Sequence, residues 1–315
     1  MDNTLCPYSW VMANYLVTGG AGFIGSHLAK KLLKMGHSVE IIDDLSKGKI
    51  ESIPPGAVFH KFDLQRPPDF LGPDRKPLDC IFHLAGQSSG ERSFADPIRD
   101  LQSNLISTYN IIQIANQLQV PKIVFASSMS VYGNQKRIPL LESSPTEPLT
   151  PYGTHKLASE QALRVFANHS KTSISVCRLF NVYGPGQDLA DRSQGMVSIY
   201  LSYLLENKPI LVKGSLDRVR DFIYIEDVID VLLLVSNSRQ GYEVLNICTG
   251  IGTRISDLLE MLLLQFPEHQ TQIEVVSGTL GDQFEVVGSP ELIESKYGWN
   301  AGVSLDKGLE KLLTN

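Results

Sequence analysis

The chain has 315 residues, 43% of them hydrophobic and 20% charged, which is enough for one large globular unit or two close-packed domains. Its net charge of −6 and its dispersed charges exclude a basic stripe for nucleic acid. No apolar stretch reaches the length of a membrane span, so we expect no membrane partner. Four scattered cysteines without a C-x-x-C pair favour a reduced, cytoplasmic protein over a disulfide scaffold or a metal site.

Residues 1–11 carry neither a basic segment nor a long apolar core, so we do not expect a secretory signal. Met12 lies two residues before the first predicted strand and is a candidate alternative start. Residues 1–14 are therefore expected to form a loose N-terminal extension.

A glycine-rich turn follows the first predicted strand, 15–17, and leads into a predicted helix, 23–35. Its glycines follow the order G-x-x-G-x-x-G, one residue different from the G-x-G-x-x-G fingerprint of many dinucleotide sites. Glycines permit a sharp turn and close approach to a ligand, and the free N–H groups of a helix start attract phosphate. A purely structural turn is the alternative. The candidate cofactor residues here are Gly19, Gly22, Phe23, Ile24 and Gly25.

Asp43 ends the second predicted strand, 38–42, about 20 residues beyond the glycines. A carboxylate at this position normally binds the hydroxyls of the adenosine ribose and repels the extra phosphate of NADP, so Asp43 favours NAD. Otherwise, Asp43 and Asp44 merely begin a solvated loop. We expect a dinucleotide site.

Predicted strands and helices then alternate as far as residue 185, which indicates an α/β fold with a doubly wound parallel sheet of the Rossmann type. The further strands are 58–62, 80–84, 122–126 and 174–178, and the main helices are 94–118, as one or two pieces, and 152–167. Small residues at the end of the fourth strand allow a ligand to approach. Additional candidate cofactor residues are Asp63, Leu64, Leu84, Ala85, Gly86 and Asn104.

The pattern changes after about residue 185. We expect residues 15–185 to form the NAD-binding domain and residues 186–315 mainly a smaller substrate-binding lobe. Parts of 220–250 are apolar enough to return to the main sheet.

Tyr152 and Lys156 are four residues apart on one face of a predicted helix that Thr150 caps. A neighbouring ammonium and an oxidised nicotinamide would both favour the phenolate, lowering the pKa of Tyr152 from about 10, so that it could act as a base. Ser128, at the end of the preceding strand, adds a hydroxyl that could share the reacting proton. Separately, each residue also fits a structural role, as a surface tyrosine, a lysine paired with Glu160 or a turn serine.

Together, these motifs resemble extended short-chain dehydrogenase/reductases, specifically the NAD-dependent sugar-nucleotide epimerase/dehydratase family. The resemblance covers residue 15 to the end. The segments that carry it, in chain order, are Thr18 to Gly25, His83 to Gly86, Ser127 to Gly133, Tyr152 to Lys156, Arg178 to Gly184, Arg220 to Asp227, Gly281-Asp282 and Tyr297 to Trp299.

The resemblance implies an enzyme that keeps NAD bound and epimerises C4 of a nucleotide sugar through a 4-keto intermediate. Tyr152 would take the 4-hydroxyl proton, Ser128 would bond O4, and Lys156 would hold the nicotinamide ribose. Asn181 and Arg220 would hold the diphosphate of the substrate. Ser88 and Asp282 complete the candidate substrate-binding residues.

Departures from the family pattern narrow the range of activities that the resemblance implies. Dehydratases and decarboxylases need an extra carboxylate where this chain has Met129 and Ser130, so a 4-epimerase of the UDP-glucose, UDP-N-acetylglucosamine or UDP-glucuronate class is favoured. Thr279 replaces an arginine that many relatives use for the nucleotide. Val286 aligns with a position that controls the room at C2. Another dehydratase or reductase and a non-catalytic NAD-binding protein remain the alternatives.

The family also implies a homodimer, formed by a four-helix bundle of the helices near 94–118 and 152–167. The apolar residues considered for that interface are Ile111, Ile112, Leu163 and Phe166. The alternative is that these side chains face their own sheet.

Overall fold

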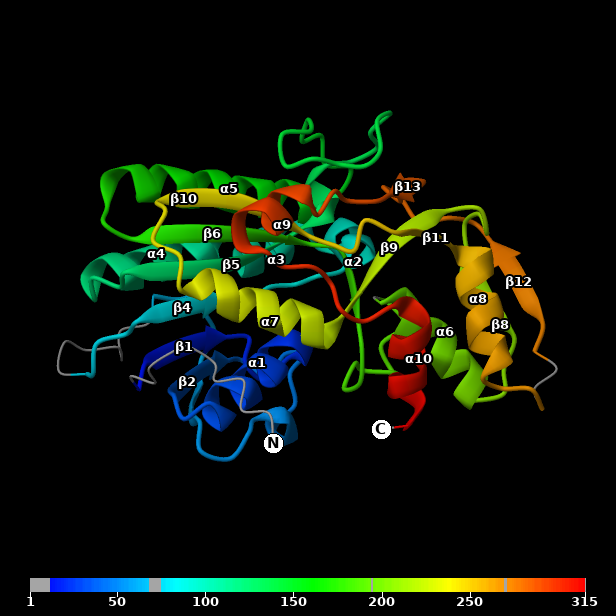
Figure 1. Cartoon of the computed structure of the whole chain (residues 1–315), viewed down its shortest axis with the longest axis horizontal. Coiled ribbons are helices and arrows are strands. Elements are labelled where there is room, and N and C mark those ends of the chain that lie inside the picture. Colours follow the sequence, from blue (N-terminus) through cyan, green and yellow to red (C-terminus); the bar gives the residue numbers. More distant parts are fainter. Residues whose placement is uncertain (1–11, 68–74, 194, 269–270, 315) are drawn as a thin grey trace.

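A seven-stranded parallel sheet forms the centre of the larger part of the molecule (Figure 1). The computed structural model describes residues 12–67, 75–193, 195–268 and 271–314. The strand order is β10-β6-β5-β4-β1-β2-β3. The strands are β1 (Asn14–Thr18), β2 (Ser38–Asp43), β3 (Val58–Lys61), β4 (Cys80–His83), β5 (Lys122–Ser128), β6 (Ser173–Leu179) and β10 (Tyr242–Ile247). The six strands predicted from residues 15 to 178 are confirmed. The order in which strands are added reverses between β1 and β4, which is where doubly wound folds bind ligands.

Both faces of this sheet are buried, because successive side chains of each strand point to opposite sides. Tyr15 and Val17 pack on one side with helices α1 and α7, whereas Leu16 packs on the other with α4 and α5. These helices are α1 (Phe23–Lys34), α7 (Ile225–Ser236), α4 (Ser107–Gln117) and α5 (Pro151–His169).

The predicted helix 94–118 is broken into several pieces. They are α2 (Gly90–Ala95), α3 (Pro97–Leu101), the π-helical turn η2 (Gln102–Ile106) and α4. Asp96 causes the break between α2 and α3, because its side chain accepts a 3.0 Å hydrogen bond from the N–H of Arg99 and caps a new helix that begins at Pro97. The π turn places Asn104 in the interior.

Helix α5 begins as predicted. The side chain of Thr150 accepts a 3.0 Å hydrogen bond from the N–H of Gly153, and Pro151 occupies the first helical position. Tyr152 and Lys156 thus lie in the first two turns of α5, at the carboxyl edge of the sheet.

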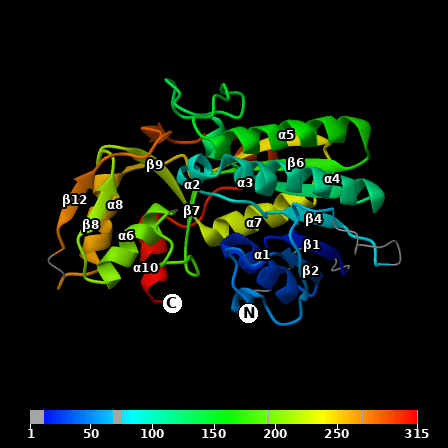
Figure 2. The ribbon, with the colours of Figure 1, turned by 180° about the vertical axis from the view of Figure 1, so that it is seen from behind.

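The second lobe is built on a four-stranded sheet and a two-stranded sheet (Figures 1 and 2). The strands are β7 (Asn181–Tyr183), β9 (Val219–Tyr224), β11 (Gly252–Arg254) and β13 (Glu285–Val286), with β8 (Ile210–Lys213) paired to β12 (Ile273–Val276). Its helices include α6 (Met196–Leu205), α8 (Ile255–Leu264) and α10 (Leu305–Thr314), whereas α9 (Glu291–Tyr297) contacts β10 of the main sheet. Short 3-10 turns are η1 (Ile50–Ser52) and η3 (Met129–Val131).

Two of the four residues considered for a dimer interface are fully buried in their own chain. Ile111 and Leu163 are both 0% exposed and belong to the core under α4 and α5, against which Ile112 and Phe166 also pack. Ile111 and Leu163 therefore face their own sheet, as the alternative interpretation expects, whereas Ile112 and Phe166 are only partly buried.

Among the described residues, no helix combines the length and the apolar character that crossing a bilayer requires. Cys80, Cys177 and Cys248 are buried free thiols. Cys6 and the rest of residues 1–11 lie outside the described residues.

Candidate functional site

The glycine turn between β1 and α1 packs so closely that side chains are excluded from it. A Cβ on Gly19 would lie 2.8 Å from the backbone nitrogen of Ala85, and one on Gly25 would clash with the carbonyl of Gly19. Gly22 is the N-cap of α1 and supplies no capping side chain, so the N–H groups of Phe23 and Ile24 open the helix toward the turn. This uncapped, glycine-lined helix start fits a pyrophosphate.

Asp43 supports this turn from the end of β2. Its carboxylate accepts hydrogen bonds from the N–H of Ala21 (3.0 Å) and the N–H of Leu45 (2.9 Å). Burial raises the pKa of Asp43, which these backbone hydrogen bonds partly offset. The residue expected at the adenosine ribose therefore also holds the glycine turn in place.

Asp63 and Leu64 lie just after β3. Leu64 is buried, and its carbonyl accepts a 2.7 Å hydrogen bond from the side chain of Asn110 on α4. The carboxylate of Asp63 accepts from the N–H of Gln65 at 2.9 Å. The corner beyond β3 is thus fixed to the same helix layer that carries Asn104.

The hydroxyl of Thr18 organises the end of β4. It accepts 3.1 Å hydrogen bonds from the N–H groups of both Leu84 and Ala85, and it pairs with the ring of His83 at 2.9 Å. Burial lowers the pKa of His83 to about 3, so the ring is neutral. Gly86 follows with a φ of +150°, a conformation that side chains rarely adopt.

Ser128, Tyr152 and Lys156 are brought together at the carboxyl ends of the central strands. All three are at least nine-tenths buried, and Ser128 acts to lower the pKa of Tyr152. The ammonium of Lys156 donates a 3.0 Å hydrogen bond to the carbonyl of Ala126 and lies 6.0 Å from the centre of the Tyr152 ring. A hydroxyl, a phenol and an ammonium thus converge, and the ammonium lies 3.3 Å from the place of a Cβ on Gly86, directly after β4.

The protein alone does not make Tyr152 a base. Burial raises its pKa to about 12, a shift to which the charge of Asp100 adds and which the Ser128 hydrogen bond opposes. Burial lowers the pKa of Lys156 to about 8, against the charges of Asp100 and Glu160. In the chain by itself, desolvation thus outweighs any lowering of the Tyr152 pKa by the neighbouring ammonium, and the lowering expected from the ammonium together with an oxidised nicotinamide stays a prediction.

In the second lobe, two arginines share one carboxylate. Arg220 is 2% exposed, and its guanidinium bonds Asp282 at 2.7 Å together with the carbonyls of Val219 and Phe284. Arg218 pairs with the other oxygen of Asp282. Sequence reasoning missed Arg218, which directly precedes β9; the available signal was its spacing of two residues from Arg220.

The remaining candidate substrate residues, Asn181 and Ser88, do not belong to this cluster of arginines around Asp282. Asn181 on β7 donates a 2.9 Å hydrogen bond to the carbonyl of Asp221, and Ser88 is exposed in the loop after β4. Val286 is 0% exposed in an apolar cluster, and its control of the room at C2 stays a prediction.

The second lobe meets the start of α5 next to Tyr152. A Cβ on Gly281 would lie 2.6 Å from both the carbonyl oxygen of Leu149 and the side chain of Thr150. The adjacent Asp282, which pairs with both arginines, therefore lies on a loop that is packed against the N-terminus of the helix that carries Tyr152 and Lys156.

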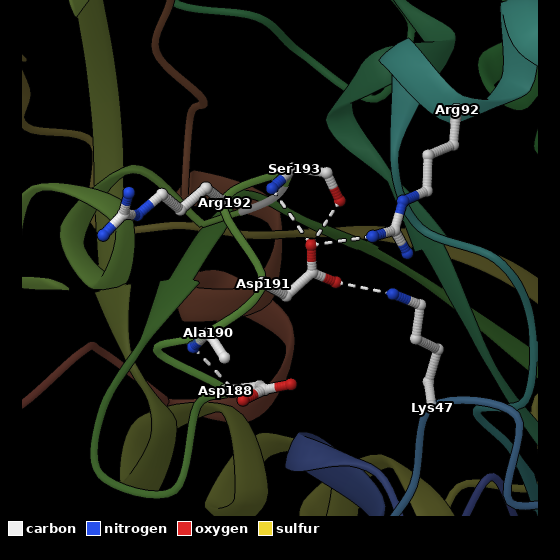
Figure 3. Close-up of a pocket in the computed structure, with 7 residues that line it drawn as sticks. All are labelled: Lys47, Arg92, Asp188, Ala190, Asp191, Arg192 and Ser193. Carbon is white, nitrogen blue, oxygen red and sulfur yellow. Dashed lines mark hydrogen bonds and ion pairs between the residues drawn. The ribbon is translucent and has the colours of Figure 1, made fainter. Parts of the chain in front are cut away.

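A polar cavity of about 420 Å³ lies where the loop after β2, helix α2 and the loop after β7 meet (Figure 3). Asp191 stands at its centre and accepts from Lys47 at 2.7 Å and from Arg92 at 2.9 Å (Figure 3). A second cavity of about 270 Å³ is lined by Glu91 and Lys213, an ion pair at 2.7 Å, and by Thr279. The ion pairs that Asp191 makes with Lys47 and Arg92, and the pair Glu91–Lys213, thus connect the larger part of the molecule to the second lobe.

Residues 15–248 match the family model described as the NAD dependent epimerase/dehydratase family. A putative UDP-glucose 4-epimerase of Methanocaldococcus jannaschii is 30% identical over 299 residues, 95% of this chain and 96% of that protein.

Solved structures agree with this match. The crystal structure of UDP-glucose 4-epimerase with UDP-glucose from Thermotoga maritima superimposes with a TM-score of 0.90 at 32% identity, covering 96% of this chain and 97% of that one. The UDP-glucose 4-epimerase of Thermus thermophilus in complex with NAD has a TM-score of 0.88 at 30% identity, covering 96% and 98%.

Proposed function

The chain belongs to the NAD-dependent epimerase/dehydratase family, and from this premise we propose that it epimerises a UDP-sugar at C4. The convergence of Ser128, Tyr152 and Lys156, with the ammonium close to Gly86, is the observation that carries the proposal. Two similar solved structures are those of UDP-glucose 4-epimerases, which supports the same activity. The proposed substrate is of the UDP-glucose, UDP-N-acetylglucosamine or UDP-glucuronate class.

NAD is the cofactor, and the turn fits its pyrophosphate because side chains are excluded and the helix start is uncapped. Asp43 would hold the adenosine ribose, and Asp63 and Leu64 would hold the adenine. Leu84 to Gly86 would contact the middle of the NAD molecule. When bound, NAD supplies a reversible acceptor for the hydride of C4. Lys156 would bond the nicotinamide ribose.

Tyr152 would remove the proton of the 4-hydroxyl and later return it, while Ser128 holds O4. Since burial raises the pKa of Tyr152 to about 12, the residue becomes a base only beside a further positive charge. The oxidised nicotinamide is such a charge. In this proposal, Tyr152 removes a proton only when oxidised NAD occupies the cofactor site. Without oxidised NAD, the phenol stays protonated.

Arg218 and Arg220 would hold the diphosphate. Two guanidinium groups face a single carboxylate, Asp282, so the buried cluster has an excess of positive charge that an anionic ligand offsets. Arg218 also supplies a cation near the loop where Thr279 replaces the arginine of many relatives. Asn181 would contact the same ligand from β7.

The alternatives are less well supported. Between Ser128 and Tyr132 the 3-10 turn η3 contains Met129 and Ser130, so no carboxylate stands there to deprotonate C5, as a dehydratase requires. A reductase would draw on NADPH, which Asp43 disfavours. A non-catalytic NAD-binding protein would not require the buried phenol of Tyr152 and the buried ammonium of Lys156.

We also propose a homodimer through α4 and α5. The residues that would meet a second copy include the exposed Tyr109 and Val165, which are 50% and 59% exposed, but not the fully buried Ile111 and Leu163. Light scattering coupled to gel filtration measures the mass directly, and a monomer would exclude the dimer.

Incubation of the protein with NAD and UDP-glucose, followed by separation of the products, tests the proposed activity. We expect UDP-galactose to accumulate to an equilibrium ratio with only catalytic amounts of NAD. Stoichiometric NADH release, or loss of water or carbon dioxide from a UDP-sugar, would replace this activity by one of the alternatives.

A further inference from the structure

Asp100 is a buried carboxylate beside the Tyr152 and Lys156 pair, and it is 1% exposed. It lies on α3, which is packed against α5 (Figure 2). A carboxylate is seldom this deeply buried unless hydrogen bonds satisfy it. The partners of Asp100 therefore show what holds it in place.

Both oxygens of Asp100 have hydrogen-bond partners. One oxygen accepts hydrogen bonds from the side-chain amides of Gln87 (2.7 Å) and Asn104 (3.2 Å). The other pairs with Nδ1 of His155 at 2.6 Å. Asp100 thus connects the loop after β4, the π turn and α5 through its two oxygens.

The amide of Asn104 is fixed by these contacts. Its nitrogen donates to Asp100 and, at 3.0 Å, to the carbonyl of Gln87, so its oxygen must point the opposite way. That oxygen is buried and has no hydrogen-bond partner among the described residues. It lies 2.5 Å from the place of a Cβ on Gly86, and the Lys156 ammonium lies 3.3 Å from the same place. An unpaired acceptor therefore faces the proposed nicotinamide ribose end of the site.

The charge of Asp100 also acts on the reacting groups. It raises the pKa of Lys156, as Glu160 does to a lesser extent, and it raises the pKa of Tyr152. The other titratable groups around it are His155 on α5, the neutral His83 on β4, exposed Arg99 on α3 itself, and Glu91 and Arg92 on α2, which pair with Lys213 and Asp191.

We propose that Asp100 is a positioning residue for the reaction: its carboxylate, which is held by Gln87 and His155, turns the amide oxygen of Asn104 toward the cofactor. The inference rests on the proposed function, because it assigns the roles of Lys156 and Tyr152 given there. Sequence reasoning did not single out Asp100 or His155, since their pairing joins positions 55 residues apart.

The substitution Asp100→Asn keeps the size of the side chain and removes its charge. A nearby negative charge favours the protonated forms of both Lys156 and Tyr152, so its loss lowers both pKa values. We expect both limbs of the pH profile of kcat to move to lower pH by about half to one unit. Glu260→Gln removes an equally charged but exposed side chain on α8 and should leave the profile unchanged.

A titration without substrate separates this inference from the proposed activity. The ultraviolet absorbance of phenolate, taken as the difference between each protein and its Tyr152→Phe counterpart, reports the ionisation of Tyr152 alone. We expect it to occur at lower pH in Asp100→Asn than in the parent, whether or not a UDP-sugar is converted. Coincident titrations would overturn the charge effect of Asp100, and absence of turnover would overturn only the activity.

Asn104→Ala tests the positioning role even if Asp100→Asn does not fold. It deletes the oriented amide oxygen and retains the charge of Asp100. We expect NAD affinity to fall about tenfold, the value of one lost hydrogen bond, while Tyr152 titrates as in the parent. Unchanged NAD affinity would show that Asp100 positions nothing the cofactor uses.

Discussion

The backbone of Gly86 faces the amide oxygen of Asn104 so closely that a Cβ on Gly86 would lie 2.5 Å from that oxygen. Gly86 follows β4 and Asn104 lies in the π turn before α4. Two segments that are separate in the sequence thus define one narrow wall of the proposed cofactor site.

Gly86→Ala should weaken NAD binding. The new methyl group must displace Asn104, and the φ of +150° adds backbone strain of about 1–3 kcal/mol. We expect about a tenfold loss of affinity or more by calorimetry. Gly302→Ala is the control, because its Cβ would meet only an ordinary contact at 3.5 Å. Equal affinities for the two variants would show that this wall does not contact NAD.

Tyr152→Phe should abolish most of the activity and leave the fold intact. The phenyl ring keeps the packing of a side chain that is 7% exposed, while the proton-transferring oxygen is lost. We expect kcat to fall by about 10²- to 10⁴-fold with NAD still bound and the circular dichroism unchanged. A variant with full activity in any UDP-sugar assay would remove Tyr152 from the mechanism.

The activity should decline in alkali as Lys156 loses its proton. Burial lowers the pKa of this ammonium to about 8, so the charged form is lost as the pH rises past that value. Lys156→Arg keeps its charge at all accessible pH values. We expect a lower kcat for Lys156→Arg but no alkaline limb, measured by initial rates across pH. Identical limbs in both proteins would assign the titration to another group.

Arg218→Ala should lower the affinity for UDP more than that for uridine. Loss of a charge-assisted hydrogen bond to phosphate costs about 1.5–3 kcal/mol, or roughly ten- to a hundredfold in affinity. Uridine, which has no phosphate, is the matched ligand. If Arg218 replaces the arginine missing at Thr279, then Thr279→Arg in the Arg218→Ala background should restore part of the UDP affinity. Equal losses for UDP and uridine would contradict the phosphate contact.

Local patterns were sufficient to predict the main sheet and the start of α5. The apolar runs of β1, β2 and β4 are bounded by glycine or aspartate, and Thr150-Pro151 specifies a helix start by itself. Apolar spacing on α4 and α5 showed which side chains are buried but not against what, so Ile111 and Leu163 could not be assigned to a sheet or to a partner.

Long-range pairings could not be predicted. Arg218 and Asp282 are 64 residues apart, and Asp191 meets Lys47 over 144 residues, so no local pattern relates them. The raised pKa of Tyr152 in the chain by itself could not be predicted for a related reason: its direction depends on burial by distant segments, which a sequence spacing of four residues does not reveal.

The most direct test of the proposed C4 epimerisation is nuclear magnetic resonance of the UDP-sugar during turnover in deuterium oxide. The hydrogen of C4 leaves and returns as a hydride without meeting solvent, so we expect UDP-glucose and UDP-galactose to interconvert with no deuterium on any carbon. Deuterium at C5 or C6 would reveal deprotonation of carbon, the chemistry of a dehydratase or decarboxylase, and would contradict the account.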